Sequence, residues 1–393
     1  MPDAEINLRE ELQRRGKDAF IAQLHQEAPL RKDANGFWIA SRFDDVRAIL
    51  LDHARFSSAA MGGGGGGGRM GVSFPLLTDD PPRHSALRGL LAKAFTPAAM
   101  EAMRPDIERL ASDLADAIPT GVEIDIVDKM TSPLPVAVIA GMMGVPSARE
   151  KDFRRWSNAI MGIQENPFDG ERIGMLMELR AYFAEVAAER RAAPGDDLVS
   201  ALTRVSDATQ TVTDQTLTDD QVVGFCILLM IAGNETTTNL LGNLINRLMS
   251  RPQDWAALRA APELIEGAIE ESLRVDSPAQ MLIRRATEDV TIDAQTIAAG
   301  DLVMVYLASA NRDPAKWDDP ANFELARERD RHVAFGHGVH TCIGAPLARM
   351  EARAAMRALV ARFERLAPGS EAGRRLPGGG LLFGFRSLPV VFG

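Results

Sequence analysis

Cysteine is scarce in this sequence of 393 residues, which contains only Cys226 and Cys342. Two cysteines do not make a disulfide framework, so the small disulfide-stapled scaffolds are excluded. Cys226 lies within an apolar run of helical character, where core packing is the natural interpretation of a lone thiol. Only Cys342 therefore requires a chemical explanation.

Segments that direct a protein to a membrane are also lacking. Residues 1–11 are acidic and contain no apolar stretch, so we expect no secretory signal and no membrane anchor. The apolar run 222–232 is too short to cross a bilayer and suits a helix at the centre of a domain. We therefore expect a cytoplasmic protein without a membrane partner.

Neither an excess of positive charge nor an interdomain linker is present. The formal net charge of −10 argues against a nucleic-acid partner. No proline- or serine-rich stretch and no change of composition divides the chain, which predicts a single domain over residues 1–393. With 46% hydrophobic and 25% charged residues, the composition is that of a globular protein with ample core.

The most informative stretch surrounds Cys342. Three glycines lie close to this cysteine, and from Pro346 onward apolar residues recur at helical spacing, so the thiol stands just before the start of a helix. Glycines let the backbone pass close to a bulky partner, and the positive end of a helix favours a thiolate. Although a lone cysteine is usually inert packing, a loop of this kind can hold a metal through sulfur.

A second polar cluster opens a helix predicted from Asp79 to Ala94. His84 and Arg88 are four residues apart and share one helix face, which suits two donors aimed at one anion. A solvated basic patch is the alternative.

The stretch from Phe335 to Gly344 matches Phe-Gly-x-Gly-x-His-x-Cys-x-Gly at every specified position and resembles the haem-binding loop of the cytochrome P450 family. The resemblance implies that the Cys342 thiolate is the proximal ligand of the iron of haem b. It also implies that His340 points at a haem propionate, that Phe335 packs against the loop, and that Gly344 and Ala232 lie beside the cofactor.

Two further segments resemble propionate-binding elements of the same family. The segment 80–88 is similar to the family's Asp-Pro-Pro-x-His-x-x-x-Arg helix, which implies that His84 and Arg88 bind propionates. Arg284 matches a further propionate-binding arginine. Its neighbour Arg285 is not expected to bind a propionate, because successive residues of a strand point to opposite faces.

The long helix predicted over 219–250 contains, at residues 232–238, residue types that disfavour a buried helix. Glycine and threonines are poor helix formers, and an acid in an apolar stretch is costly to bury. The Thr236 hydroxyl can bond the carbonyl of Ala232, and Gly233 leaves room beside it. The segment resembles the family's distal Ala-Gly-x-Glu-Thr-Thr motif, which implies that Glu235 and Thr236 form a proton route for oxygen activation. A helix kink with a capped acid is the alternative.

The remaining site predictions are structural contacts and a substrate pocket. Glu271, Arg274 and Arg327 resemble the family's buried glutamate–arginine network, a structural feature. The glycine run 62–68 is either a hinge beside the pocket or a tolerated insertion. The predicted pocket residues are Met61, Met70, Val72, Phe74, Leu229, Gly233, Ala279, Gln280, Leu282, Leu382 and Phe383.

The predicted fold is mainly α with small β-sheets, a cytochrome P450 fold with haem between the long central helix and the cysteine loop. Helices are expected at 8–26, 44–51 and 219–250, and over 101–205 with short breaks. The sheet-rich part comes from 28–42, around the turn Asn35-Gly36, and from 280–310, with strands at 290–292 and 302–307. The tail 378–391 has strand character. Asp293 and Ala298 replace the glycine and proline usual in the family.

The resemblance implies a monooxygenase that inserts one oxygen atom from O2 into a small apolar organic substrate, with a terpenoid or aromatic compound favoured. Electrons are expected from NAD(P)H through a separate ferredoxin-type partner with its reductase. A basic patch of Arg83, Lys93, Arg331 and Arg349 is a candidate docking surface for an acidic carrier. A peroxide-driven peroxygenase and a non-catalytic haem-binding sensor are the alternatives.

Overall fold

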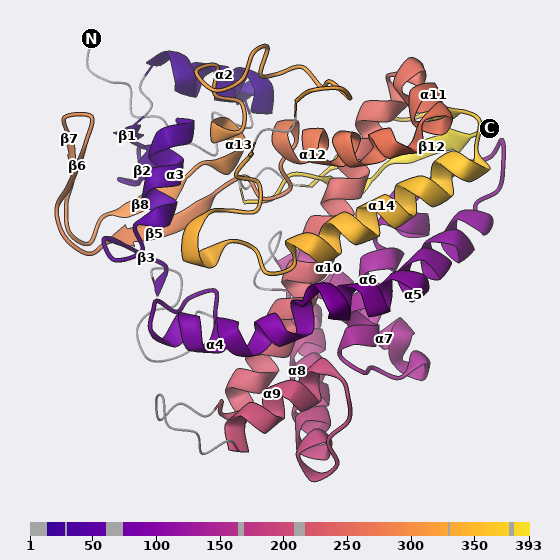
Figure 1. The fold of residues 1–393 in the computed structure, drawn as a ribbon, viewed down its shortest axis with the longest axis horizontal. Coiled ribbons are helices and arrows are strands. Elements are labelled where there is room, and N and C mark those ends of the chain that lie inside the picture. The colour runs from indigo at the N-terminus through magenta and orange to yellow at the C-terminus, as the bar shows by residue number, and fades with distance from the viewer. Residues whose placement is uncertain are drawn as a thin grey trace.

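The computed structural model describes residues 14–27, 30–59, 74–163, 169–207, 217–328, 331–376 and 381–393 (Figure 1). The glycine run and the predicted pocket residues Met61, Met70 and Val72 lie outside these ranges. Helices predominate, and the short strands form small sheets in separate parts of the molecule. The predicted fold class, mainly α with small β-sheets, is confirmed.

The sheet-rich side combines the start of the chain with residues 282–305. Strands β1 (Leu30–Lys32) and β2 (Trp38–Ala40) form the predicted hairpin, with Leu30 opposite Ala40. The five-stranded sheet has the order β1-β2-β8-β5-β3 and includes β3 (Phe56–Ser57), β5 (Leu282–Ala286) and β8 (Leu302–Val305). Helices α2 (Lys17–Glu27) and α3 (Phe43–Leu51) lie beside it (Figure 1).

The helical side contains most of the core. Its early elements are α4 (Arg83–Leu91), α5 (Pro97–Asp116), α6 (Pro133–Met142), α7 (Glu150–Ile163), α8 (Gly170–Ala192) and α9 (Leu198–Asp207). The later ones are α10 (Asp219–Met249), α11 (Pro252–Ala260), α12 (Ile265–Val275), α13 (Leu307–Ala310) and α14 (Ala345–Arg362). Helix α10 crosses the middle of the molecule and packs against α6, α8, α12 and α14 (Figure 1). Residues near the middle of α10 are therefore held from several sides.

Short helical turns and strands complete the described part. The turns are Ala92–Phe95, Val127–Thr131, Ser147–Arg149, Pro262–Leu264 and Gly338–His340. The strands β4 (Glu123–Asp125), β12 (Pro389–Phe392) and β9 (Leu366–Pro368) form a three-stranded sheet. Two further pairs are β6 (Val290–Ile292) with β7 (Gln295–Ile297) and β10 (Arg374–Arg375) with β11 (Phe385–Ser387).

The structure corrects several predicted boundaries. The helix predicted over 8–26 is interrupted at Gly16, which has φ +76°, and α2 begins after it. The segment 101–205 is not wholly helical, because β4 pairs with β12 from the far end of the chain. The strand predicted to end at residue 307 ends at Val305, since Leu307 already begins α13. These deviations depend on pairing with distant segments or on one glycine.

The turn between β6 and β7 contains Asp293, which stands where glycine is usual in the family. Asp293 has φ +45° and Ala294 has φ +62°. Positive φ is natural for glycine and strained for alanine, so this hairpin adopts a glycine-type turn without glycine.

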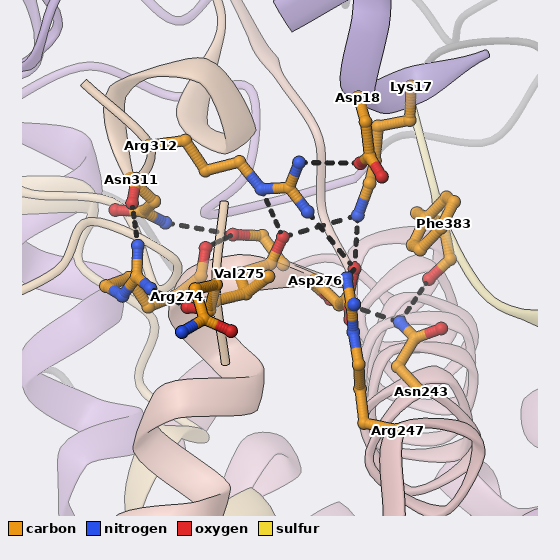
Figure 2. A network of polar contacts seen from close by, with 12 residues as sticks. Lys17, Asp18, Asn243, Arg247, Arg274, Val275, Asp276, Asn311, Arg312 and Phe383 are labelled. Atoms are coloured by element: carbon orange, nitrogen blue, oxygen red, sulfur yellow. Dashed lines mark hydrogen bonds and ion pairs between the residues drawn. The ribbon is translucent and has the colours of Figure 1, made fainter. Parts of the chain in front are cut away.

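A buried polar network centred on Asp276 joins α2 to the ends of α10 and α12 (Figure 2). Arg247 of α10 donates from Nε and Nη2 to the Asp276 carboxylate over 2.5 and 3.1 Å. Lys17 of α2 also donates to this carboxylate, and Arg312 Nη2 lies 3.5 Å from it. Arg312 in turn binds Asp18 over 2.6 Å. The network fastens the first described helix to the centre of the fold.

Among the described helices, none combines the length and the apolar character required to cross a bilayer.

Candidate active site

The loop before α14 presents the Cys342 thiol beside backbone donors. The Cys342 N–H donates to the Phe335 carbonyl over 2.8 Å, which closes the loop. Burial raises the pKa of this thiol, while the N–H of Gly344, the Arg88 guanidinium and the N–H of Ala345 act in the opposite direction. The cysteine nevertheless remains accessible. The loop therefore offers a sulfur ligand with donors already directed at a thiolate.

Two glycines allow this loop its path. Gly336 and Gly338 have φ +72° and +73°, in the region that favours glycine. A Cβ added at Gly338 would lie 2.4 Å from the Leu50 carbonyl oxygen at the end of α3. The motif glycine at 338 is thus required by close packing of backbone on backbone.

Four donor side chains from three separate elements gather near Cys342. His84 and Arg88 come from α4, Arg284 from β5 and His340 from the cysteine loop, and the rings of His84 and His340 have centroids 4.0 Å apart. Burial lowers the pKa of Arg284 to about 10, and burial together with His84 and Arg284 lowers that of His340 to about 3. We call these four residues the cationic cradle, after the two arginines that carry its charge. Arg285 is exposed, as strand register predicts.

The cationic cradle fits an anionic ligand. Both ring nitrogens of His84 and Nε2 of His340 are buried without a hydrogen-bond partner in the described ranges. Buried polar groups are normally paired, since leaving one unpaired costs about 1–3 kcal/mol. These unpaired donors and the two arginines fit the two propionates of haem, and the accessible thiol fits its iron.

The middle of α10 carries an acid and an alcohol. Glu235 is buried, and this burial raises its pKa to about 7. The Thr236 hydroxyl donates to the Ala232 carbonyl over 2.7 Å, which is the predicted contact. Ala232 is exposed, and Leu229 and Thr236 are half-buried, although the flanking residues of α10 are mostly buried. One face of α10 is therefore open at Ala232 and Thr236, whereas Glu235 lies buried beside it.

Gly233 does not provide the expected open space. A Cβ added there would lie 2.5 Å from the Ile139 Cδ1 atom of α6. Glycine at this position lets α6 approach α10, and its place in the substrate pocket stays a prediction.

The predicted glutamate–arginine contacts are present. Arg274 donates from Nε and Nη2 to the two Glu271 oxygens over 2.8 Å each, and Arg327 Nε donates to Glu271 Oε1 over 2.9 Å. The Glu324 N–H donates to the same oxygen over 3.1 Å. Both Glu271 and Arg274 are buried, so this fully bonded group is costly to disrupt.

The other predicted pocket residues divide into two groups. Ala279 and Leu382 form a β-bridge, and Leu282 Cδ1 lies 3.7 Å from the Cβ position of Gly336 in the cysteine loop, so these three residues can line a site beside it. Phe74 is half-buried at the edge of the main core. Gln280 is buried and donates to the Ser277 carbonyl, and the Phe383 ring lies between cations, with Lys17 Nζ 3.8 Å and Arg375 4.2 Å from its centroid. Their place in the pocket stays a prediction.

A cavity of about 560 Å³ opens next to the cysteine loop, and its walls include Arg331 and Arg349 from the predicted basic patch. Arg83 instead pairs with Asp79 over 3.0 Å, and the side chain of Lys93 lies outside the described parts. The cavity is also lined by the cations Arg47, Lys316 and Arg353, which no sequence motif predicted. No local pattern marks them, since they come from three distant segments.

Arg349 is held in place by Glu270 and His332, two further residues that the sequence motifs did not predict. Arg349 donates from Nε and Nη2 to Glu270 over 2.6 and 2.7 Å, and His332 Nε2 lies 3.2 Å from the same carboxylate. These hydrogen bonds outweigh burial and lower the pKa of Glu270 to about 2. The Arg349 guanidinium lies 4.5 Å from the centroid of the Phe335 ring, which connects the cavity to the cysteine loop.

Fold and site together define the class, a haem-thiolate oxidoreductase. The chain belongs to the cytochrome P450 family, whose model (Cytochrome P450) matches residues 36–388, and it is a cytochrome P450 monooxygenase. It is 36% identical over 380 residues to the putative cytochrome P450 YjiB of Bacillus subtilis, covering 92% of this chain and 93% of that protein. It is 36% identical over 383 residues to the cytochrome P450 monooxygenase PikC of Streptomyces venezuelae, covering 94% and 89%.

A solved structure shows the same fold. The crystal structure of CYP109E1 from Bacillus megaterium in complex with testosterone has a TM-score of 0.84 at 35% identity, covering 95% of this chain and 98% of that one. Membership of the family implies a haem cofactor, an organic substrate and a redox partner.

Proposed function

We propose that this enzyme inserts one oxygen atom from O2 into a small apolar organic substrate, using haem b and electrons that reach it from NAD(P)H through a separate ferredoxin-type carrier. The observation that carries the proposal is the Thr236 hydroxyl at the open face of α10, with the buried acid Glu235 next to it in the sequence. We expect the protein in the cytoplasm.

Each part of the site has a role in this proposal. Cys342 holds the iron through its thiolate, and the cationic cradle binds the propionates. When bound, haem supplies the chemistry that activates dioxygen. Glu235, with a pKa of about 7, holds a proton that it can release near neutral pH, and the Thr236 hydroxyl lies next to it in sequence to pass that proton on. Ala232 and Gly344 leave room beside the cofactor.

The substrate contacts come from Leu229, Ala279, Leu282, Leu382 and Phe74, which are apolar and half-buried. A ligand in an apolar site gains mainly from burial of its own apolar surface. A steroid is bound by a relative of the same fold, and steroids are terpenoid-derived. This supports the terpenoid option and places steroids first in a panel of terpenoids and aromatic compounds for spectral binding titrations.

The electron carrier is proposed to dock over the cavity beside the cysteine loop. Five cations line this cavity, namely Arg47, Lys316, Arg331, Arg349 and Arg353, against the two acids Glu266 and Glu270. An excess of positive charge on an otherwise acidic protein attracts an acidic carrier and raises its association rate.

Turnover with a surrogate ferredoxin system tests the reaction class. Thr236→Ala is expected to retain haem and substrate binding while more of the reducing equivalents form hydrogen peroxide, because the relay hydroxyl is lost. Thr237→Ala is the matched control, since its side chain is buried on another face of α10 and should leave the coupling of NADPH consumption to product unchanged.

The same assay separates the alternatives. A peroxygenase would form product with hydrogen peroxide and not with the ferredoxin system, and a sensor would form none with either. Unchanged coupling in Thr236→Ala would remove the proton-relay assignment.

A further inference from the structure

Asp80 occupies the junction between the sheet and the helix that carries half of the cationic cradle. Its carboxylate uses both oxygens, because Ser57 Oγ donates to Oδ2 over 2.5 Å and the Ser58 N–H donates to Oδ1 over 2.8 Å. Its own carbonyl accepts the His84 N–H over 3.0 Å. One residue therefore binds β3 with its side chain and the first turn of α4 with its backbone.

This junction matters because β3 is paired with the strand that carries Arg284. In the antiparallel register Ser57 lies opposite Arg285, next to Arg284 in the chain. The Ser57–Asp80 hydrogen bond thus ties α4, with His84 and Arg88, to β5, with Arg284. The Ser58 N–H bond to the same carboxylate acts at the same junction.

The charge of Asp80 acts on the same residues. Burial lowers the pKa values of Arg284, His84 and His340, and the Asp80 carboxylate raises each of them. Asp80 therefore partly offsets the effect of burial on these three groups. The same charge repels an incoming propionate, so position and charge have opposite effects on haem affinity.

We propose that Asp80 is a positioning residue for haem, whose hydrogen bonds to Ser57 and Ser58 hold α4 against β3 so that His84 and Arg88 face Arg284 and His340 across one propionate-binding site. The effect is one of position and not of charge. The inference rests on the proposed role of the cationic cradle, and the experiment below keeps the two apart.

The test measures the rate at which ferric holoenzyme transfers haem to excess apomyoglobin, followed by absorbance. Asp80→Ala removes both hydrogen bonds of the tether, and Ser57→Ala removes the one from the Ser57 hydroxyl while the Ser58 N–H bond remains. Asp80→Ala is expected to speed transfer about tenfold, the order of effect of a hydrogen bond to a charged group, and Ser57→Ala is expected to speed it by a smaller factor. Asp80→Asn keeps an acceptor for the Ser58 N–H and a donor for the Ser57 hydroxyl while losing the charge. It is expected to transfer haem no faster than the wild type.

Three control variants complete the design. Asp79→Asn changes the adjacent carboxylate, which accepts the Leu76 N–H over 2.8 Å and is not bonded to Ser57, and it should match the wild type. Thr96→Ala removes the N-cap of α5 and measures the effect of general destabilisation on haem loss. Arg284→Ala tests the cationic cradle itself and should accelerate transfer.

The outcomes are distinct. If Arg284→Ala speeds transfer while Ser57→Ala and Asp80→Ala do not, the positioning role of Asp80 is wrong and the cationic cradle stands. If Asp80→Asn loses haem as fast as Asp80→Ala, charge and not position carries the effect. If Thr96→Ala, at an equal loss of melting temperature, matches Ser57→Ala, the effect is ordinary destabilisation. If Arg284→Ala has no effect, the propionate assignment fails first.

Discussion

The burial of Glu235 predicts a specific dependence of stability on pH. Its side chain lies in the middle of α10 with 3% exposure, and burial raises its pKa from 4.5 to about 7. One pKa unit is worth about 1.4 kcal/mol, so a fully ionised Glu235 costs the folded enzyme about 3 kcal/mol relative to the unfolded chain. Glu235→Gln replaces the acid with a group of the same shape that does not ionise.

The sign follows from where each state keeps its proton. The unfolded chain releases the Glu235 proton near pH 4.5, whereas the folded enzyme retains it up to about pH 7. The folded state therefore binds more protons between these values, and the contribution of Glu235 to stability falls as the pH rises through that window. The free energy of unfolding of Glu235→Gln minus that of the wild type should rise by about 2.5 kcal/mol from pH 5 to pH 8.

Thermal unfolding of both proteins across this pH range provides the assay. For a chain of this length, such a change corresponds to a relative gain of about 3 °C in melting temperature for the variant at pH 8. Other titrating groups cancel in the difference between the two proteins. Glu185→Gln, at an exposed position of α8, is the control, and its difference from the wild type should stay constant. Parallel pH curves for Glu235→Gln and the wild type would refute the reasoning.

Three further predictions follow from contacts described above. Cys342→Ala should abolish the red-shifted absorption of the reduced carbon monoxide complex, and survival of that band would remove the ligand assignment. Arg274→Ala should cost about 3–5 kcal/mol of unfolding free energy because it leaves the Glu271 carboxylate buried without its bidentate partner. A loss below 1 kcal/mol in urea unfolding, roughly that of a surface pair, would contradict this. Burial lowers the pKa of Lys17 from 10.5 to about 7, so the folded enzyme loses this proton earlier than the unfolded chain. The stability of Lys17→Met minus that of the wild type should therefore decrease from pH 7 to pH 10 in thermal unfolding, and a constant difference would argue against it.

The parts of the candidate site could be proposed from the sequence because each of them is contiguous. The thiol, its glycines and the start of the following helix lie within residues 335–349, and the acid and the alcohol are neighbours at 235 and 236. Local physical rules apply within such stretches. A threonine hydroxyl reaches the carbonyl four residues back wherever the helix is intact, and the Thr236–Ala232 bond shows this.

The contacts that the sequence did not predict join side chains from distant segments. Ile139 of another helix lies against Gly233, and the Phe383 ring lies between Lys17 and Arg375. Neither contact can be inferred from the residues that flank it in the sequence. Such contacts depend on how close helices and strands approach one another in three dimensions.

Cys342 in its glycine-rich loop shows what the sequence determines and what only the tertiary structure decides. Its motif and its place before a helix were legible in the order of residues, because glycine geometry and helix polarity are local properties. The residues that pack around the cysteine loop could not be inferred from the order of residues. Asp80 bound to Ser57, and Glu270 holding Arg349 over Phe335, join residues that lie 23 and 79 positions apart, so only packing of the folded chain brings them together.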